Sequence, residues 1–431
     1  MGRCETLEAE IRCRRAGGVV GFPLDQVASI EKQEVPTYGS PMPGRPGADD
    51  PPASPTLAID AAPGIAGEPA AREILDRIEQ LTASISGGGS DSATESARRS
   101  LAAMNAYLGN LAARSGDYEE AEARYRRALD HDPALPVARL NLSAVLITID
   151  RHDAAESILL DVLSGNPGDP RALELLGEAA FQRGRTDEAI EWWRKAIANG
   201  AGGGLPGRLE KALMLKDAEE GFQETGGGRF ALRYDGEEAS PELAREILAH
   251  LEQAHADLSG RLGHYPGAVI QVILYSRSSF HEVTGTPDWV GGIFDGQVRI
   301  PIRGLNHLTP QARHVLMHEL THSFVASKTR GSAPRWIQEG VAQLMEGRSA
   351  AREKAAMAAG YAAGGGDYAT SFDYAKSLSQ IEFLVEGWSS FHLNDLLDHL
   401  GRGTDIDSAM KGAIGLSYGE FLTAWGNWLT R

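Results

Sequence analysis

The sequence has few of the features that mark disulfide-stabilised, membrane-spanning or exported proteins. Only two of its 431 residues are cysteines, Cys4 and Cys13, and both lie near the N-terminus, so no disulfide framework holds the body of the chain. No apolar run approaches the roughly eighteen residues that suggest a membrane span. The first residues lack the apolar centre of a signal peptide, so the chain as given is expected in the cytoplasm.

Positive charge is also scarce. The 42 Lys and Arg residues are outnumbered by 59 Asp and Glu residues, and the formal net charge is -17 at pH 7. So acidic a chain is expected to bind neither nucleic acid nor anionic membranes. A hydrophobic fraction of 42% and a charged fraction of 23% are ordinary for globular protein, and the length allows two or three domains.

Residues 1–35 predict a small β segment. Short strand-like stretches flank Gly17-Gly18, which is a hairpin signal, but the segment is too small to bury a core of its own. Residues 36–66 are rich in Pro, Gly, Ala and Asp and predict a disordered linker. Because Met1 leads abruptly into this β segment, a lost leader is a second interpretation, and the protein would then be periplasmic or extracellular.

An internal repeat with a period of 34 residues occupies the predicted helical region, residues 67–225. Small residues recur where paired helices cross closely, large ones fill the gap between them, and proline ends the second helix. This period is the signature of tetratricopeptide repeats, which predicts an all-α solenoid that binds a protein partner, with helices at about 205–222 as its cap. The three copies are marked by Gly109, Gly116, Ala121, Tyr125, Ala128 and Pro133; by Leu142, Ala155, Leu159 and Pro167; and by Leu176, Gly177, Gly184, Ala189, Trp193 and Ala196.

The pattern changes at Gly226-Gly227-Gly228, which predicts a domain boundary and a second domain over residues 226–431. Strands are expected at 230–234 and 268–275, and Asp295-Gly296 suits the two-residue turn of a hairpin over 293–298. Ser240-Pro241 and Thr309-Pro310 are helix starts. Strands leading into helices predict an α+β domain, and we expect residues 228–431 to fold without the repeats.

The run His318-Glu319-Leu320-Thr321-His322 is the strongest chemical signal. On a helix, His318 and His322 lie at i and i+4, so both imidazoles project from one face and can hold one ion. Glu339, seventeen residues after His322, would supply a third ligand from a second helix. Two imidazoles and a carboxylate with an open fourth position are typical of catalytic zinc. Glu319, beside the first ligand, would be the general base toward a zinc-activated water.

Glu346 lies seven residues after Glu339 and shares its helix face, so it is either an acid that orients an imidazole through its other nitrogen or a solvated helix-end residue. The HExxH run, the W-x-x-E-G-x-A run from Trp336 to Ala342 and a later tyrosine segment resemble the gluzincin metallopeptidases, the clan of thermolysin and aminopeptidase N. The chain is also similar to bacterial peptidase-MA-like proteins that join tetratricopeptide repeats to such a domain. The resemblance covers roughly residues 228–431.

The resemblance implies a role for Tyr374. The run Tyr374-Ala375-Lys376-Ser377 looks like the Tyr-x-Lys-small motif of the aminopeptidase-like branch, in which the tyrosine hydroxyl steadies the oxyanion of the tetrahedral intermediate. A packing tyrosine at a helix start is the alternative. The chain lacks the Gly-Ala-Met-Glu-Asn segment with which aminopeptidases hold a substrate N-terminus, so endopeptidase action stays open. Residues 290–293 and 298–301 would form the edge strand that pairs with substrate.

These observations predict a zinc metallopeptidase with one Zn2+ per chain, held by His318, His322 and Glu339, with Glu319 and Tyr374 as catalytic residues. The repeats would recruit a peptide or protein substrate or a protein partner. Two alternatives remain. One is a non-catalytic zinc-binding interaction scaffold, although a structural zinc site more often has four protein ligands with cysteine among them, and no cysteine is near. The other is hydrolysis of a non-peptide amide or ester at the same zinc.

Overall fold

The computed structural model divides by compactness into two units, Met1–Met42 and Pro43–Arg431. In the first unit the predicted β segment is confirmed as three antiparallel strands in the order β1 (Cys4–Thr6), β2 (Glu10–Arg15) and β3 (Gly18–Pro23). The predicted linker over 36–66 lies outside the described residues. The structure describes residues 4–6, 10–15, 18–23, 71–86, 91–286, 291–302, 305–370 and 372–430.

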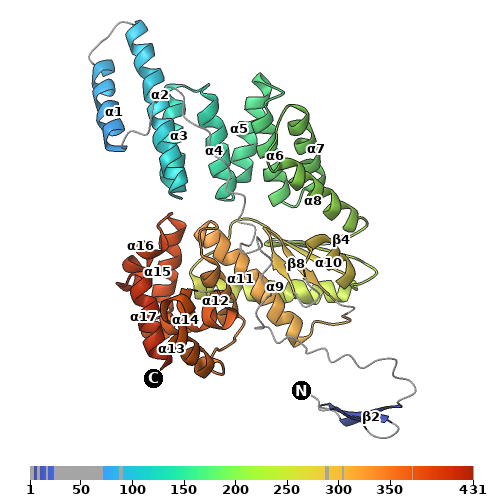
Figure 1. Cartoon of the computed structure of the whole chain (residues 1–431). Coiled ribbons are helices and arrows are strands. Elements are labelled where there is room, and N and C mark those ends of the chain that lie inside the picture. Colours follow the sequence, from blue (N-terminus) through green and yellow to red (C-terminus); the bar gives the residue numbers. More distant parts are fainter. Residues whose placement is uncertain are drawn as a thin grey trace. The chain divides into compact units, whose positions relative to one another are not determined.

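The second unit begins with helices that contact one another in chain order, as Figure 1 shows. Glycines allow the paired helices to touch: a Cβ at Gly109 would lie 2.6 Å from the Tyr125 ring, and one at Gly177 would lie 2.3 Å from the Trp193 ring. Gly177 and Trp193 lie two periods of 34 residues after Gly109 and Tyr125, so the same contact recurs. The helices are α1 (Ala71–Ser86), α2 (Asp91–Arg114), α3 (Tyr118–His131), α4 (Pro136–Thr148), α5 (His152–Gly165), α6 (Pro170–Gln182), α7 (Thr186–Ala198) and α8 (Leu205–Ala218).

A five-stranded mixed sheet follows, in the order β4-β5-β6-β8-β7. The outer pairs β4·β5 and β8·β7 are antiparallel, and β5·β6 and β6·β8 are parallel. The strands predicted at 230–234 and 268–275 are confirmed as β5 and β6. The strands are β4 (Gln223–Gly227), β5 (Phe230–Tyr234), β6 (Ile270–Tyr275), β7 (Ile293–Phe294) and β8 (Val298–Pro301).

Two details differ from the predicted strand pattern. The glycine run was expected to mark a domain boundary; that division stays a prediction, but Gly226 and Gly227 belong to β4, whose extended backbone has φ of 153° and 150° there, a conformation open to glycine. The hairpin at Asp295 was expected to have a two-residue turn. Phe294 instead pairs with Val298, which leaves three residues in the turn. The Asp295 and Gln297 side chains of this turn both bond Arg299.

Helices pack on this sheet and on one another around one apolar core. The predicted starts are confirmed: the Ser240 hydroxyl caps α9 and the Thr309 hydroxyl caps α11, each before a proline. Within the described residues no helix is long and apolar enough to cross a membrane. The helices are α9 (Pro241–Leu262), α10 (Arg277–Thr284), α11 (Pro310–Thr329), α12 (Arg335–Met345), α13 (Lys354–Thr370), α14 (Tyr374–Gly387), α15 (Ser390–Gly401), α16 (Ile406–Ile414) and α17 (Tyr418–Leu429).

Candidate metal centre

Helix α11 carries the first three residues of the site in its buried middle. His318, Glu319 and His322 are all buried, although polar side chains are seldom buried unless they have partners or a function. Leu320 and Phe324 on the same helix are fully buried in the apolar core. Packing on one side of α11 therefore holds the two imidazoles rigidly on the other.

Helix α12 brings Glu339 to the two histidines. The Nε2 atoms of His318 and His322 are 3.2 Å apart, and Glu339 Oε2 lies 3.5 Å from the first and 3.8 Å from the second. Two ligands at zinc bond lengths and a tetrahedral angle stand about 3.4 Å apart, so these three atoms have the spacing of a zinc donor set. Among the described residues they form the one group of three such side chains whose donor atoms converge. The three predicted ligands thus lie together.

Gly340 explains why Glu339 can reach the site. A Cβ on Gly340 would lie 2.4 Å from the carbonyl oxygen of Ser377, so α12 touches the backbone of α14 there. The contact sets α12 between α11 and α14. The glycine that follows the third predicted ligand is therefore a packing requirement, which the sequence pattern alone did not explain.

Glu346 stands behind the first histidine. Its Oε2 atom is 3.6 Å from His318 Nδ1, and its side chain is 7% exposed, so it is a buried neighbour of the imidazole and the solvated alternative was wrong. Burial alone would lower the pKa of His318, but the nearby carboxylates of Glu339, Glu346 and Glu319 outweigh it and raise the pKa to about 10. The acids around His318 thus attract positive charge, whether a proton or a metal ion.

The other titratable groups of the site have forms that suit metal ligation. Burial lowers the pKa of His322 to about 4, which leaves its imidazole neutral at pH 7. Burial opposes ionisation of Glu339, but the neighbouring histidines outweigh it and hold the pKa of Glu339 below its ordinary value. A neutral imidazole and an ionised carboxylate are the forms that bind metal.

Glu319 lies directly under the sheet edge. Burial raises its pKa to about 7, and the nearby His318 acts against that rise. A Cβ on Gly292, just before β7, would lie 2.8 Å from Glu319 Cγ and 2.8 Å from Ile300 Cδ1. The backbone at Gly292 is therefore pressed between Ile300 of β8 and the candidate base. The edge strand was expected at 290–293 and 298–301. Among the described strands β7, which is only Ile293–Phe294, lies at the edge of the sheet, whereas β8 lies inside the sheet between β6 and β7. Val290 lies outside the described residues.

Tyr374 is the first residue of α14, which Asp373 caps. Burial raises the pKa of Tyr374, and the charges of Glu339 and Glu319 add to the rise, so its ring belongs to the same electrostatic environment as the metal centre. The Tyr374 hydroxyl lies 3.5 Å from Arg335 Nη2. The Arg335 guanidinium in turn lies 3.9 Å from the ring centroid of Phe372. Sequence reasoning missed Arg335 because no motif includes the residue before Trp336.

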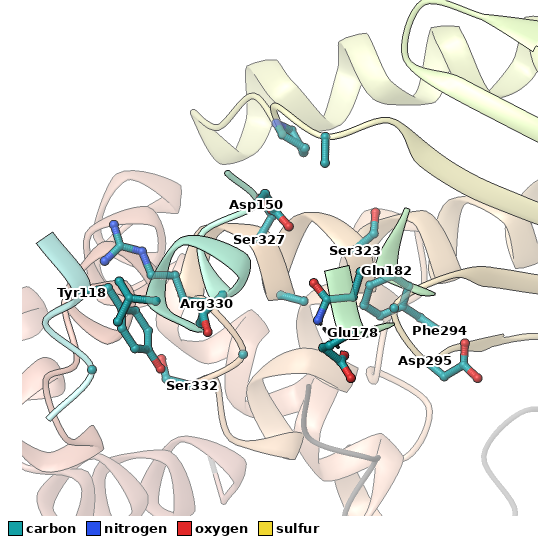
Figure 2. Close-up of a pocket in the computed structure, with 18 of the residues that line it drawn as sticks. Tyr118, Asp150, Glu178, Gln182, Phe294, Asp295, Ser323, Ser327, Arg330 and Ser332 are labelled. Carbon is teal, nitrogen blue, oxygen red and sulfur yellow. Dashed lines mark hydrogen bonds between the residues drawn. The ribbon is translucent and has the colours of Figure 1, made fainter. Parts of the chain in front are cut away.

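A separate cleft of about 910 Å³ lies between the repeat helices and α11. Figure 2 shows Glu178 and Gln182 of α6 on one side and Ser323 and Ser327 of α11 on the other. His318, His322 and Glu339 do not line it. The repeat helices and α11 therefore share a cavity that is distinct from the candidate metal centre.

Comparisons with known proteins match the repeat region. Two family models, both described as tetratricopeptide repeat, match residues 112–174 and residues 150–204. A small glutamine-rich tetratricopeptide repeat-containing protein 2 from Mycosarcoma maydis is 33% identical over 89 residues, which are 21% of this chain and 25% of that protein. The chain thus spans about a quarter of the length of this relative. The predicted tetratricopeptide repeats are confirmed, and with them a module that makes contacts between proteins.

Proposed function

We propose that the protein is a zinc-dependent metallopeptidase whose tetratricopeptide repeats recruit its protein substrate or a protein partner. One observation carries the proposal: the donor atoms of His318, His322 and Glu339 converge at zinc-site separations beside the buried carboxyl of Glu319. The half of the chain that holds them, from about residue 226, is proposed as an α+β domain of the gluzincin kind.

His318, His322 and Glu339 would hold one Zn2+, which when bound polarises a water molecule and the carbonyl of the bond to be cleaved. Glu319 takes the proton that the attacking water loses and delivers it to the departing amine. The Tyr374 hydroxyl donates a hydrogen bond to the carbonyl oxygen as that oxygen becomes negative.

The edge of the sheet suggests how a substrate is held. Among the described strands β7 is the last of the sheet, so its outer backbone groups have no strand partner there and could pair with an extended peptide. Its start at Gly292 lies against Glu319, which would bring the paired peptide to the candidate base. The cleft between α6 and α11 offers the repeats a place to hold a second segment of the same protein or of a partner.

The second candidate function is a zinc-binding interaction scaffold without catalysis. The confirmed repeats favour it, because repeats of this family bind other proteins and need no enzyme beside them. The chemistry of the donor set favours the hydrolase, since two imidazoles and one carboxylate leave a fourth position open. The buried Glu319 beside that position has no evident use in a scaffold.

Metal analysis and digestion of a broad peptide library test the proposal. The purified chain is expected to carry one zinc and to cleave peptides. His322→Ala removes a ligand and should lose both zinc and cleavage. Glu319→Gln nearly preserves shape but cannot accept a proton, so it should keep zinc and lose on the order of a thousandfold in turnover.

Each outcome decides between the candidates. Full zinc content in His322→Ala would overturn the ligand assignment. A zinc-loaded parent that cleaves no peptide would favour the scaffold, and cleavage of amide or ester dyes alone would move the substrate class away from peptides. Parent-like turnover in Glu319→Gln would remove Glu319 from the mechanism.

A further inference from the structure

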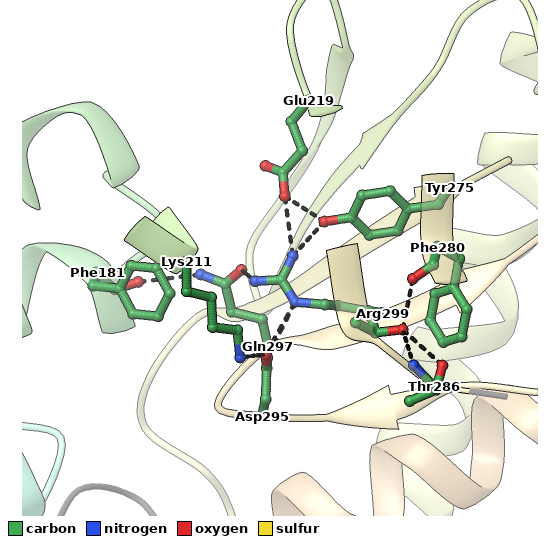
Figure 3. A network of polar contacts seen from close by, with 10 residues as sticks. Phe181, Lys211, Glu219, Tyr275, Phe280, Thr286, Asp295, Gln297 and Arg299 are labelled. Carbon is green, nitrogen blue, oxygen red and sulfur yellow. Dashed lines mark hydrogen bonds and ion pairs between the residues drawn. The ribbon is translucent and has the colours of Figure 1, made fainter. Parts of the chain in front are cut away.

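The β7–β8 hairpin is tied to the repeat helices by a fully buried arginine. Arg299, in the middle of β8, has a side chain that is 1% exposed, and Figure 3 shows acceptors on every side of its guanidinium. Nη1 donates to Glu219 Oε1 at 3.0 Å and also to the Tyr275 hydroxyl. The Tyr275 hydroxyl donates in turn to Glu219. Nε lies 3.1 Å from Asp295 Oδ1, and Nη2 lies 2.7 Å from Gln297 Oε1.

The partners of Arg299 come from both halves of the second unit. Glu219 directly follows α8, the last helix of the repeat region. Lys211 of α8 lies 2.9 Å from Asp295 Oδ2, and Gln297 Nε2 donates to the carbonyl oxygen of Phe181, in α6, at 3.1 Å. Three residues of the hairpin therefore contact the repeat region. They are Asp295, which pairs with Lys211, Gln297, which bonds the carbonyl oxygen of Phe181, and Arg299, which bonds Glu219.

The same hairpin reaches the candidate base. Ile300 follows Arg299 directly, and its Cδ1 atom and Glu319 Cγ would each lie 2.8 Å from a Cβ on Gly292. Gly292 is three residues before Asp295, about 10 Å along an extended chain. A small rotation of the hairpin at its turn would therefore shift the backbone that lies on Glu319.

We propose that Arg299 is a positioning residue, which uses Glu219 of the repeat region to hold the β7–β8 hairpin and its Gly292 backbone in register with Glu319. The inference rests on the proposed hydrolase, because it gives the repeats a role in placing substrate at that site. Arg299 acts through the hairpin and does not touch the reacting atoms.

A purely supporting role is a weaker account of this arrangement. A buried ion pair is costly to desolvate, and apolar residues of similar volume often stabilise a fold as well or better. A guanidinium makes directional hydrogen bonds, which an apolar side chain cannot make. Its planar fork of N–H groups holds several acceptors in one plane. Apart from the Tyr275 hydroxyl of β6, those acceptors belong to the hairpin and to the repeat end, whose register places Gly292.

Glu219 offers a matched pair of variants in the full-length protein. Its Oε2 atom bonds Arg233 of β5 at 2.5 Å, while its Oε1 atom bonds Arg299. Glu219→Gln weakens both bonds and leaves Arg299 paired with Asp295. Arg233→Gln weakens only the bond that does not reach the hairpin. The difference between the two variants therefore reports the bonds of Glu219 Oε1, which are those to Arg299 and to the Tyr275 hydroxyl.

Peptide kinetics, zinc content and hydrogen exchange of residues 291–302 are measured for the parent and both variants. Glu219→Gln is expected to raise KM about tenfold, because contacts displaced by a fraction of an ångström weaken substrate placement. It should keep its zinc and speed exchange in the hairpin. Arg233→Gln should stay within about twofold of the parent in KM. Arg299→Lys, which keeps the charge but loses the fork, should resemble Glu219→Gln.

The outcomes separate this inference from the proposed function. A merely structural role would lower the fraction of active enzyme, and so the apparent kcat, with KM unchanged, and that result would overturn the inference. Equal effects of Glu219→Gln and Arg233→Gln would overturn it too. If the parent cleaves no peptide, the proposed function fails, and hydrogen exchange alone then decides whether Glu219 holds the hairpin.

Discussion

Two buried charged clusters lie in the same compact unit, and their charges are balanced in different ways. Around Arg299, the carboxylates of Glu219 and Asp295 face the cations of Arg299, Arg233 and Lys211. Around the candidate metal centre, the carboxylates of Glu319, Glu339 and Glu346 surround two imidazoles, with Arg348 Nη1 3.8 Å from Glu346 Oε1 and the charge of Arg335 near Glu339. Glu339 Oε2, Glu346 Oε1 and His322 Nδ1 have no hydrogen-bond partner among the described residues.

The difference fits a structural role for the Arg299 cluster and the proposed metal-binding role for the His318 cluster. A buried polar atom without a partner costs about 1–3 kcal/mol, and a fold that needed only rigidity would have little reason to keep several in one place. The cluster at Arg299 satisfies its charges within the chain. The cluster at His318 brings the Nε2 atoms of both histidines and Glu339 Oε2 together, an arrangement that a bound cation would complete.

Truncation tests the first cluster and has the largest expected effect. A fragment 228–431 removes Glu219 and β4, so Arg299 keeps only part of its acceptor set, and breaking a buried pair costs about 3–5 kcal/mol. That is comparable with the whole stability of many domains, about 5–15 kcal/mol. The fragment is therefore expected to aggregate, contrary to the expectation from the glycine run.

The longer fragment 205–431 is the control for this truncation. It keeps Lys211, Glu219 and β4 and still lacks the three repeats. It is expected to be soluble and to unfold cooperatively on heating, as circular dichroism would measure. A soluble, zinc-loaded fragment 228–431 would show instead that the Arg299 cluster is dispensable for folding.

Two tyrosines sharpen the contrast by activity. The Tyr275 hydroxyl is bonded inside the Arg299 cluster, whereas the Tyr374 hydroxyl lies 3.5 Å from Arg335 Nη2 and within the influence of the Glu339 and Glu319 charges. Tyr374→Phe deletes only the hydroxyl, and loss of one oxyanion donor typically costs on the order of a hundredfold in kcat. Tyr275→Phe should instead lower the melting temperature, since each lost buried hydrogen bond costs about 1–3 kcal/mol.

Steady-state kinetics and thermal melts of both variants test this contrast. Tyr374→Phe is expected to have the melting temperature of the parent and to bind zinc. Its kcat should fall by about a hundredfold, with little change in KM. Unchanged kcat in Tyr374→Phe would make Tyr374 a packing residue. In that case the oxyanion donor would have to be sought elsewhere, with Arg335 the first residue to replace.

Sequence reasoning selected three candidate ligands that do lie together, because they follow helical periodicity. His318 and His322 are one turn apart, and Glu339 lies in a second helix with its own start signal, so local rules sufficed. The repeats were found for a similar reason, since Gly109 and Tyr125 recur at a fixed period as Gly177 and Trp193.

The Arg299 cluster could not be found in this way. Its members lie far apart in the chain, and an arginine in a strand with alternating residues predicts an exposed side chain. The glycine run was interpreted as a boundary between domains. Glycine is common both in linkers and in strands that need positive φ, as Gly226 does, so the run alone does not distinguish the two. Only the paired strands decide between these two uses.

Glu346 gives the smallest and most selective comparison. Glu346→Gln keeps the side-chain shape but removes the negative charge 3.6 Å from His318 Nδ1, so the imidazole loses the acid that orients it and favours a positive partner. Loss of such a partner typically weakens metal binding about tenfold to a hundredfold. The same substitution in the other cluster, Glu219→Gln, should leave zinc affinity unchanged, because Glu219 bonds Arg299, Arg233 and Tyr275 and none of the candidate zinc ligands.

Competition with a chelating dye measures the zinc dissociation constants of both variants. If Glu346→Gln bound zinc as tightly as the parent, Glu346 would be a buried helix-end acid, and the negative charge that favours the metal would come from Glu319 and Glu339 alone.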